Sequence, residues 1–336
     1  MKRRLADGLI RILLLGGVLF LVSIVSLCVG PAGISFGKIL SLILKGSGTT
    51  EFSIIFDIRF PRIILGFAIG GSLAISGVIL QGMFRNPLVE PYTLGISGGA
   101  ALGVCLSIIL GLKGSLGALS IPLAGFLGAI SVILAVYFLG AKKGILKIQG
   151  LLLTGVMISF ISSSLIMLIM ALSRIEDLRG IIFWTMGSLG GADWFLIKIV
   201  LTVAILGIIV ASFYSMDLNA FSLGEEETLH LGINIERTKK LLFVLASLLT
   251  GISVSVSGII GFVGLVVPHF VRMLVGSDHR ILLISSFLCG GAFLIFCDTL
   301  ARTVVLPLEL PVGVITGILG GSVFVYALAK RRSYTL

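Results

Sequence analysis

Long apolar runs separated by short polar stretches organise this chain. A helix of about 20 apolar residues crosses the hydrocarbon core of a bilayer, which is about 30 Å thick. The second run begins at Pro61, a residue suited to the first turn of a helix. The pattern predicts one membrane domain over residues 1–336 with ten transmembrane helices, at about 10–30, 61–83, 93–112, 119–140, 149–172, 194–214, 241–260, 261–275, 281–300 and 312–329.

The stretch from Gly251 to Arg280 is apolar, yet glycines and Pro268 interrupt it. Inside a helix, Gly costs about 1 kcal/mol and Pro about 3 kcal/mol relative to Ala. Backbone groups freed at membrane depth must find partners within protein or beside a water-filled path. We expect two closely packed spans joined by a tight turn, in a protein that forms a pathway. The predicted structural breaks are Gly258, Pro268 and, after the second run, Asn86, Pro87 and Pro91.

The composition supports an all-α integral membrane protein. Of 336 residues, 57% are hydrophobic and 12% are charged, whereas soluble domains carry about 25% charged residues. The four cysteines lie in apolar runs and form no CxxC pair, so no metal or redox site is predicted. The chain has no HExxH helix, no nucleotide-binding GxxxxGK[ST] loop and no second membrane-centred Asp. We therefore expect no catalytic residue and no cofactor.

The net charge is +10, and the basic residues form short clusters between the apolar runs. Such clusters are typical of membrane proteins, in which they set the orientation of the chain, and they do not indicate nucleic-acid binding. Ten spans place both termini on one side of the membrane. With the N-terminus in the cytoplasm, 16 of the 25 Lys and Arg residues lie inside and 9 lie outside. This bias predicts that both termini are cytoplasmic.

A weak internal repeat appears when the chain is shifted by 181 residues. Ser72, Ser76, Gly77, Ile79 and Pro87 then overlay Ser253, Ser257, Gly258, Ile260 and Pro268. In the predicted topology the two copies cross the membrane in opposite directions, as the repeats of many transporters do. The pattern therefore favours an inverted repeat.

Three motifs in order resemble one family. GGSLAISGVILQGMFRNPLVEPYTLGISGGAALG (70–103), GFVGLVVPHFVRMLVGSDHR (261–280) and DTLARTVVLPLELPVGVITGILGGSVFVYAL (298–328) are similar to segments of the FecCD-type permeases. These are the membrane subunits of ATP-driven importers for ferric siderophores, vitamin B12 and haem. The resemblance implies a ten-span fold in a bacterial or archaeal inner membrane. It also implies as partners a second copy of the chain, two ABC ATPase subunits, an extracytoplasmic substrate-binding protein and membrane lipid.

The polar stretch 217–240 is the longest predicted cytoplasmic loop. In the resembled family this loop forms the coupling helices that sit in a cleft of the ATPase. The residues to which the resemblance assigns this role are Gly224, Glu225, Glu226, Glu227, Thr228, Leu231 and Gly232.

Arg59, Arg62 and Arg302 are cations on the predicted outer side. They match arginines that pair with glutamates of the binding protein in the B12 importer of this family, which implies a docking role. Exposed ion pairs contribute only about 0–1 kcal/mol each, so docking would use them for steering and register. A structural alternative is an i,i+4 pair between Asp298 and Arg302 within one helix.

The leading functional hypothesis is the permease of an ABC importer for a metal chelate, with a ferric siderophore as the preferred substrate. Cobalamin, haem and molybdate remain alternatives in the same class. An ion-coupled secondary transporter would need buried acids within the spans. Here only Asp298 approaches such a position.

Overall fold

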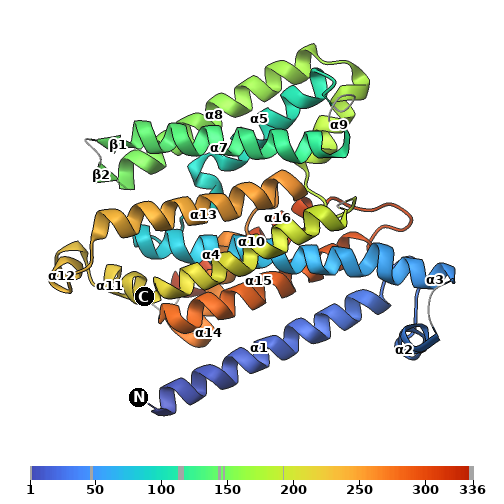
Figure 1. Cartoon of the computed structure of the whole chain (residues 1–336), viewed down its shortest axis with the longest axis horizontal. Coiled ribbons are helices and arrows are strands. Elements are labelled where there is room, and N and C mark those ends of the chain that lie inside the picture. The colour runs from blue at the N-terminus through green and yellow to red at the C-terminus, as the bar shows by residue number, and fades with distance from the viewer. Residues whose placement is uncertain are drawn as a thin grey trace.

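The computed structural model describes residues 2–45, 48–112, 117–142, 145–146, 148–191 and 193–332. Most of its long helices lie along one long axis (Figure 1). In chain order the elements are α1 (Lys2–Cys28), α2 (Phe36–Lys45), α3 (Thr50–Ser53), the π-helix η1 (Ile54–Arg59), α4 (Phe60–Phe84), η2 (Pro91–Leu94), α5 (Ile96–Ile109), η3 (Gly117–Leu119), α7 (Ser120–Gly140), β1 (Ala141–Lys142), β2 (Ile145–Leu146), α8 (Ile148–Leu172), α9 (Ile175–Thr185), α10 (Trp194–Phe213), α11 (Ser215–Phe221), α12 (Glu225–His230), α13 (Ile235–Ser257), α14 (Val263–Val275), α15 (His279–Ala301) and α16 (Val312–Arg332). The two short strands form an antiparallel hairpin.

Each of the ten apolar runs contains one of the longer helices. Within the described residues, seven helices are long and apolar enough to cross a membrane, and α5, α14 and α16 add three shorter apolar ones. One start differs from the expectation, because the helix that contains Pro61 begins at Thr50 and passes through η1 into α4 without interruption. Lys113, Lys143 and Lys147, three cations used in the orientation count, lie outside the described residues.

Helix α4 forms the centre of the bundle. In its most apolar 18-residue window 89% of the residues are buried, against 6% in α1 and 11% in α8. Its neighbours are α15, α13, α10 and α14. A helix that is apolar on all sides can be enclosed by other helices or can face lipid, and α4 is enclosed. In contrast, α1 and α8 expose apolar surface, as expected of helices that face lipid or another subunit.

Two glycine pairs let the backbones of α4 and its neighbours touch. A Cβ added at Gly70 would lie 2.2 Å from the Gly290 carbonyl oxygen of α15, and one at Gly77 would lie 1.9 Å from the Gly264 carbonyl oxygen of α14. In membranes, where lipid is as apolar as leucine, close packing of small residues is a main source of helix association.

Replacing Gly77 with alanine should push α4 away from α14. A new methyl group in a packed core costs about 1–3 kcal/mol, and here it meets backbone that cannot rotate away. We expect a clear fall in the thermal unfolding midpoint of the full chain in detergent. Gly17→Ala is the matched control, because a Cβ at Gly17 meets nothing within 4 Å. Equal midpoints for the two variants would contradict the packing described.

The chain breaks after α4 and again after α13, and the two breaks pack together. Arg85 ends α4 in the left-handed conformation, and Gly258 ends α13 with φ of 72°. The Tyr92 hydroxyl donates to the Ile260 carbonyl at 2.8 Å and accepts from the Ile260 amide at 3.1 Å. The first break contains Asn86, Pro87 and Pro91, and the second begins at Gly258. Proline and glycine at these positions favour an interruption of the helix.

Pro268 corrects the expectation, because it lies inside α14 rather than at a break. A proline at that position cannot donate to the carbonyl four residues earlier, which belongs to Gly264. The buried Gln81 amide of α4 donates to that carbonyl at 3.2 Å. A side chain from the neighbouring helix therefore satisfies the group that the proline leaves free.

The arrangement around these breaks partly fits an inverted repeat. Helices α4 and α13 run in opposite directions, and each is followed by a break and a shorter helix (Figure 1). The 181-residue shift does not align the elements, however, because Pro87 lies in a break and Pro268 lies within a helix. The sequence identities therefore do not mark equivalent structural positions throughout.

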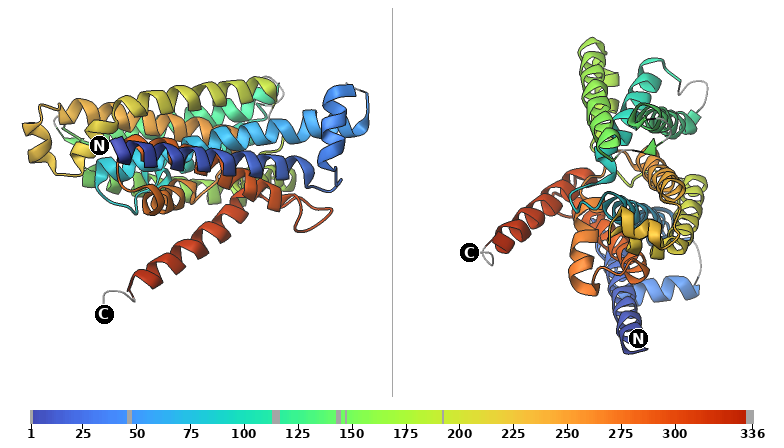
Figure 2. Two further views of the ribbon diagram at one scale, coloured as in Figure 1. Left: turned by 90° about the horizontal axis from the view of Figure 1, so that it is seen from below. Right: turned by 90° about the vertical axis from the view of Figure 1, so that its left-hand side faces the viewer.

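The bundle has two distinct ends, named here by the short helices they hold. At the α12 end lie α11, α12, the start of α1 and the end of α16, and at the α3 end lie α2, α3 and α9 (Figure 1). Helix α16 leaves the bundle at an angle and projects from its side (Figure 2). Helices α8 and α16 extend in different directions from the body, so both offer large free faces (Figure 2).

Candidate functional site

Helices α11 and α12 form a compact hairpin at the α12 end. Gly224 precedes α12 with φ of 126° and Gly232 follows it with φ of 79°, both in the left-handed region that favours glycine. The two predicted glycines therefore bound a short helix, as expected for the segment between them. Because side chains are strained in this conformation, the hairpin depends on glycine at both positions.

Buried polar contacts hold α12 against the bundle. The fully buried Thr228 hydroxyl donates to the carbonyl oxygens of Ala220, at 2.9 Å, and Gly224. The buried Lys239 of α13 donates to the Glu225 carboxylate at 2.8 Å. Of the predicted coupling residues, Thr228 is thus internal, and Glu225 is exposed but tied to α13.

The outward surface of this hairpin is both acidic and apolar. Glu226, Glu227 and Leu231 are exposed, as a contact role requires. Two further leucines, Leu223 and Leu229, are exposed beside them. The sequence analysis overlooked these two, although a leucine in a polar loop was the available signal. Exposed apolar side chains rimmed by charge are typical of a protein interaction site.

Asn219 of α11 fastens the hairpin to the start of α15. Its side-chain oxygen accepts from the His279 amide at 2.9 Å, and its amide nitrogen donates to Asp278 at 3.0 Å. Hydrogen bonds from Arg280, and then from Asn219, hold the pKa of the Asp278 carboxyl below its usual range. The hairpin is therefore linked to the long helices α13 and α15, so that motion of one reaches the other.

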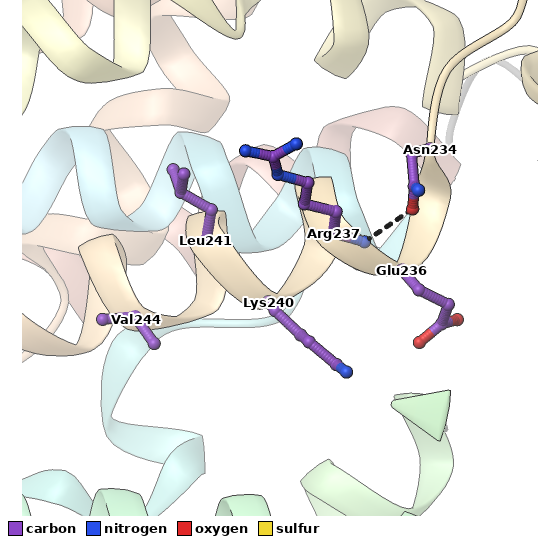
Figure 3. A pocket seen from close by; sticks show the side chains of 6 residues that line it. All are labelled: Asn234, Glu236, Arg237, Lys240, Leu241 and Val244. Atoms are coloured by element: carbon purple, nitrogen blue, oxygen red, sulfur yellow. Dashed lines mark hydrogen bonds between the residues drawn. The ribbon is translucent and has the colours of Figure 1, made fainter. Parts of the chain in front are cut away.

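A groove of about 580 Å³ lies along the start of α13, beside the hairpin. Asn234 caps the helix there by accepting from the Arg237 amide at 3.0 Å. Figure 3 shows the lining side chains on successive turns, which are Asn234, Glu236, Arg237, Lys240, Leu241 and Val244. The groove mixes charges of both signs.

The predicted docking arginines form an ion-pair cluster at the α3 end. Arg62 contacts Asp298 at 2.9 Å and Glu309 at 3.0 Å, and Arg302 contacts the other oxygen of Asp298 at 3.0 Å. Arg302 also donates to the Ser26 hydroxyl at 2.9 Å. The structural alternative, an Asp298–Arg302 pair within one helix, is therefore present.

All three arginines are buried. Arg59, Arg62 and Arg302 are 2%, 8% and 3% exposed. Arg59 donates to the backbone carbonyls of Leu27 and Ala32, which ties the end of α1 to η1. A docking role would need guanidinium groups at the surface, whereas in the described structure they serve intramolecular partners.

No catalytic or metal-binding constellation is found in the described part of the chain. Among those residues, no group of three or more His, Cys, Asp or Glu side chains could hold a metal ion. The four cysteines are free and lie in helices.

The described chain is thus a bundle of long apolar helices with a compact hairpin at one end. The chain matches the FecCD transport family over residues 18–330, and it belongs to that family. It is thus an ABC transporter permease of the cell membrane.

Curated relatives cover most of the chain. The hemin transport system permease protein HmuU of Yersinia pestis is 38% identical over 329 residues, which is 95% of this chain and 96% of the relative. The cobalamin import system permease protein BtuC of Halobacterium salinarum is 42% identical over 287 residues, covering 85% of this chain and 76% of the relative. These two relatives differ in the substrate that their names state.

Among solved structures, a metal-chelate type ABC transporter in an inward-facing conformation matches with a TM-score of 0.85. The two chains are 30% identical, and the match covers 95% of this chain and 98% of the other. PsaBC from Streptococcus pneumoniae, solved with a Fab, matches with a TM-score of 0.54 at 17% identity over 80% of this chain and 90% of the other, which shows a shared fold alone.

Proposed function

We propose that this chain is the membrane-spanning subunit of an ATP-driven importer that carries a metal chelate delivered by a substrate-binding protein. The observation that carries the proposal is the α11–α12 hairpin, whose acidic and apolar surface stands at one end of a FecCD-family bundle. ATP hydrolysis belongs to a separate ABC ATPase, for which this hairpin is the docking and coupling element.

Ten spans with both termini in the cytoplasm fit this role. The seven long and three shorter apolar helices together correspond to the ten runs of the sequence. The start of α1 and the end of α16 lie at the α12 end (Figure 1). The excess of Lys and Arg favours the cytoplasm for that end, which places the hairpin where an ATPase could reach it.

We propose a homodimer with a central path, on two ATPase subunits. The faces of α8 and α16 support it, because α8 exposes Phe160 and Met167, and α16 exposes Ile318 and Val325. One part of this surface would meet the second copy and the rest would meet lipid. The similarity to a solved metal-chelate type ABC transporter supports an assembly of this kind.

The binding protein would dock at the α3 end, on the opposite side from the ATPase. Arg59, Arg62 and Arg302 stay proposed as residues of that end. Their contribution to docking requires release from their internal partners, so it depends on a rearrangement of η1 and the end of α15.

Asp298, the acidic residue that comes closest to lying within a predicted span, does not favour an ion-coupled transporter. Asp298 pairs with two arginines, Arg62 and Arg302, and is therefore fully compensated. A proton- or sodium-coupled carrier would need an acid that loses and regains its partner during transport. We therefore retain the ATP-driven class.

A ferric siderophore is the proposed cargo, chosen as the commonest substrate of the family that the sequence resembles. Haem and cobalamin follow from the names of the relatives, and molybdate from the wider class. The described part of the chain has no metal-binding cluster, so the metal would be recognised through its chelator.

Uptake into proteoliposomes tests the proposal. The vesicles would hold this chain with its ATPase, and binding protein would be added outside with ferric siderophore, haem, cobalamin or molybdate in parallel. We expect accumulation of the siderophore only when ATP is hydrolysed inside. Accumulation of another ligand would replace the cargo and keep the class, whereas uptake driven by an ion gradient without ATP would overturn the class.

A further inference from the structure

A cavity of about 890 Å³ opens at the α12 end, separate from the groove on α13. Its wall comes from the last turn of α4, the middle of α14, the start of α15 and the last turns of α16. Fifteen described residues line it, and none is Asp or Glu. Three of them, Arg85, Arg272 and Lys330, carry a permanent positive charge. The side chains that line the cavity therefore carry positive charge and no negative charge.

Arg272 is held in place but poorly compensated. Among the described residues, its half-buried guanidinium has one side-chain hydrogen bond, a long one of 3.4 Å to the Gln81 side-chain oxygen. Gln81 is itself fixed, because its amide donates to the Gly264 carbonyl at 3.2 Å. A guanidinium carries five N–H donors, so most of the donor capacity of Arg272 has no protein acceptor among the described residues.

The other two cations also lack acidic partners. Arg85 and Lys330 are exposed, and no described carboxylate forms an ion pair with either. Asp278 lies between α14 and α15, and it forms an ion pair with Arg280. His279 also lines the cavity, and its Nε2 has no hydrogen-bond partner in the described part of the chain.

The rest of the lining is apolar or aromatic. Phe270 and Met273 of α14 and Tyr326 of α16 border the cavity, and two serines, Ser222 and Ser277, add hydroxyl groups. A ligand that satisfies this lining has an anionic head with several acceptor oxygens and an adjoining apolar part. Phosphate matches the donor geometry of Arg, which binds it in a bidentate manner.

We propose that this cavity binds a phosphate-bearing anion, with the phosphate held by Arg272 and screened by Arg85 and Lys330 at the rim. An anionic phospholipid headgroup and free inorganic phosphate share this chemistry. Such a ligand would join α4, α14 and α16 beside Ser222, which lies between α11 and α12 of the hairpin. Occupancy would therefore stabilise the end of the bundle from which the hairpin projects. The inference does not depend on the proposed cargo, since it concerns a cavity at the α12 end of this chain.

Thermal unfolding of the full chain in detergent tests the site. Short-chain phosphatidylglycerol, short-chain phosphatidylcholine, and phosphate against chloride at equal ionic strength would each be titrated. We expect phosphatidylglycerol to raise the midpoint by several degrees and phosphatidylcholine to have no such effect. A shift with phosphatidylglycerol alone identifies a lipid headgroup, and a shift with phosphate as well identifies the phosphate group itself as sufficient.

Two variants locate the effect. Arg272→Gln and Lys330→Gln should each raise the apparent Kd about tenfold, the loss expected when one charge-assisted hydrogen bond disappears. If Arg272→Gln fails to fold, Lys330→Gln carries the test, because its side chain is exposed. Arg237→Gln is the matched control, since this exposed cation at the same end lies on the α13 groove beside Glu236. The proposal is overturned if phosphatidylcholine acts equally, or if the cavity variants respond like the control.

Discussion

Replacing Asp298 with alanine is expected to destabilise the chain by about 3–5 kcal/mol, the range measured when one partner of a buried ion pair is removed. Asp298 is buried and contacts Arg62 and Arg302 at 2.9 and 3.0 Å. Without it, two buried guanidinium groups lose their main counter-charge. The expected result is a large fall in the thermal unfolding midpoint, or failure of the full chain to fold in the membrane.

Glu309→Gln is the control for this experiment. Glu309 also contacts Arg62, at 3.0 Å, but its side chain is 52% exposed. A pair with one exposed partner contributes at most about 1 kcal/mol, so this variant should unfold close to the wild type. A small effect of Asp298→Ala would show that the arginines do not depend on Asp298, which would favour their proposed role in docking. Charge reversal of Arg62 alone could not separate docking from folding, because it would break the same cluster.

Replacing residues 225–231 with a Gly/Ser linker should abolish ATP-driven uptake and copurification of the ATPase. The linker removes the exposed acids and leucines of α12 and also the Thr228 and Lys239 contacts that hold the helix on the bundle. A flexible chain cannot transmit motion from a bound ATPase to α13 and α15. The measurement is the ATPase recovered with tagged permease, together with uptake into vesicles.

A Gly/Ser replacement of residues 303–306 is the matched control, since these residues form an exposed turn at the α3 end. It should leave ATPase recovery unchanged. Recovery of the ATPase with the 225–231 variant would show that α12 is not the coupling element. Intact folding of both variants would be checked by their unfolding midpoints.

Much of the architecture follows from the sequence, because membrane helices are encoded locally. A span needs a continuous apolar run, and each of the ten runs contains a helix, although α1 begins at Lys2 and the helix through Pro61 begins at Thr50, both well before the expected starts. The short helix between Gly224 and Gly232 was also predictable, since glycine at both ends permits the positive φ angles found there. The motifs and their order likewise indicated a permease, and the family match agrees.

Packing between distant segments was decided only by the tertiary structure. The sequence marks Pro268 as a helix breaker, but it does not show that Gln81 satisfies the carbonyl that Pro268 leaves free. It also does not show that Gly77 lies against the Gly264 backbone. It marks Arg62 as a cation near a helix start, but not that Asp298, 236 residues away, neutralises it. These outcomes depend on which helices become neighbours. A proline in a helix leaves a carbonyl without its hydrogen bond, and a buried arginine needs a counter-charge. Only the folded bundle determines which residue provides that hydrogen bond or that counter-charge.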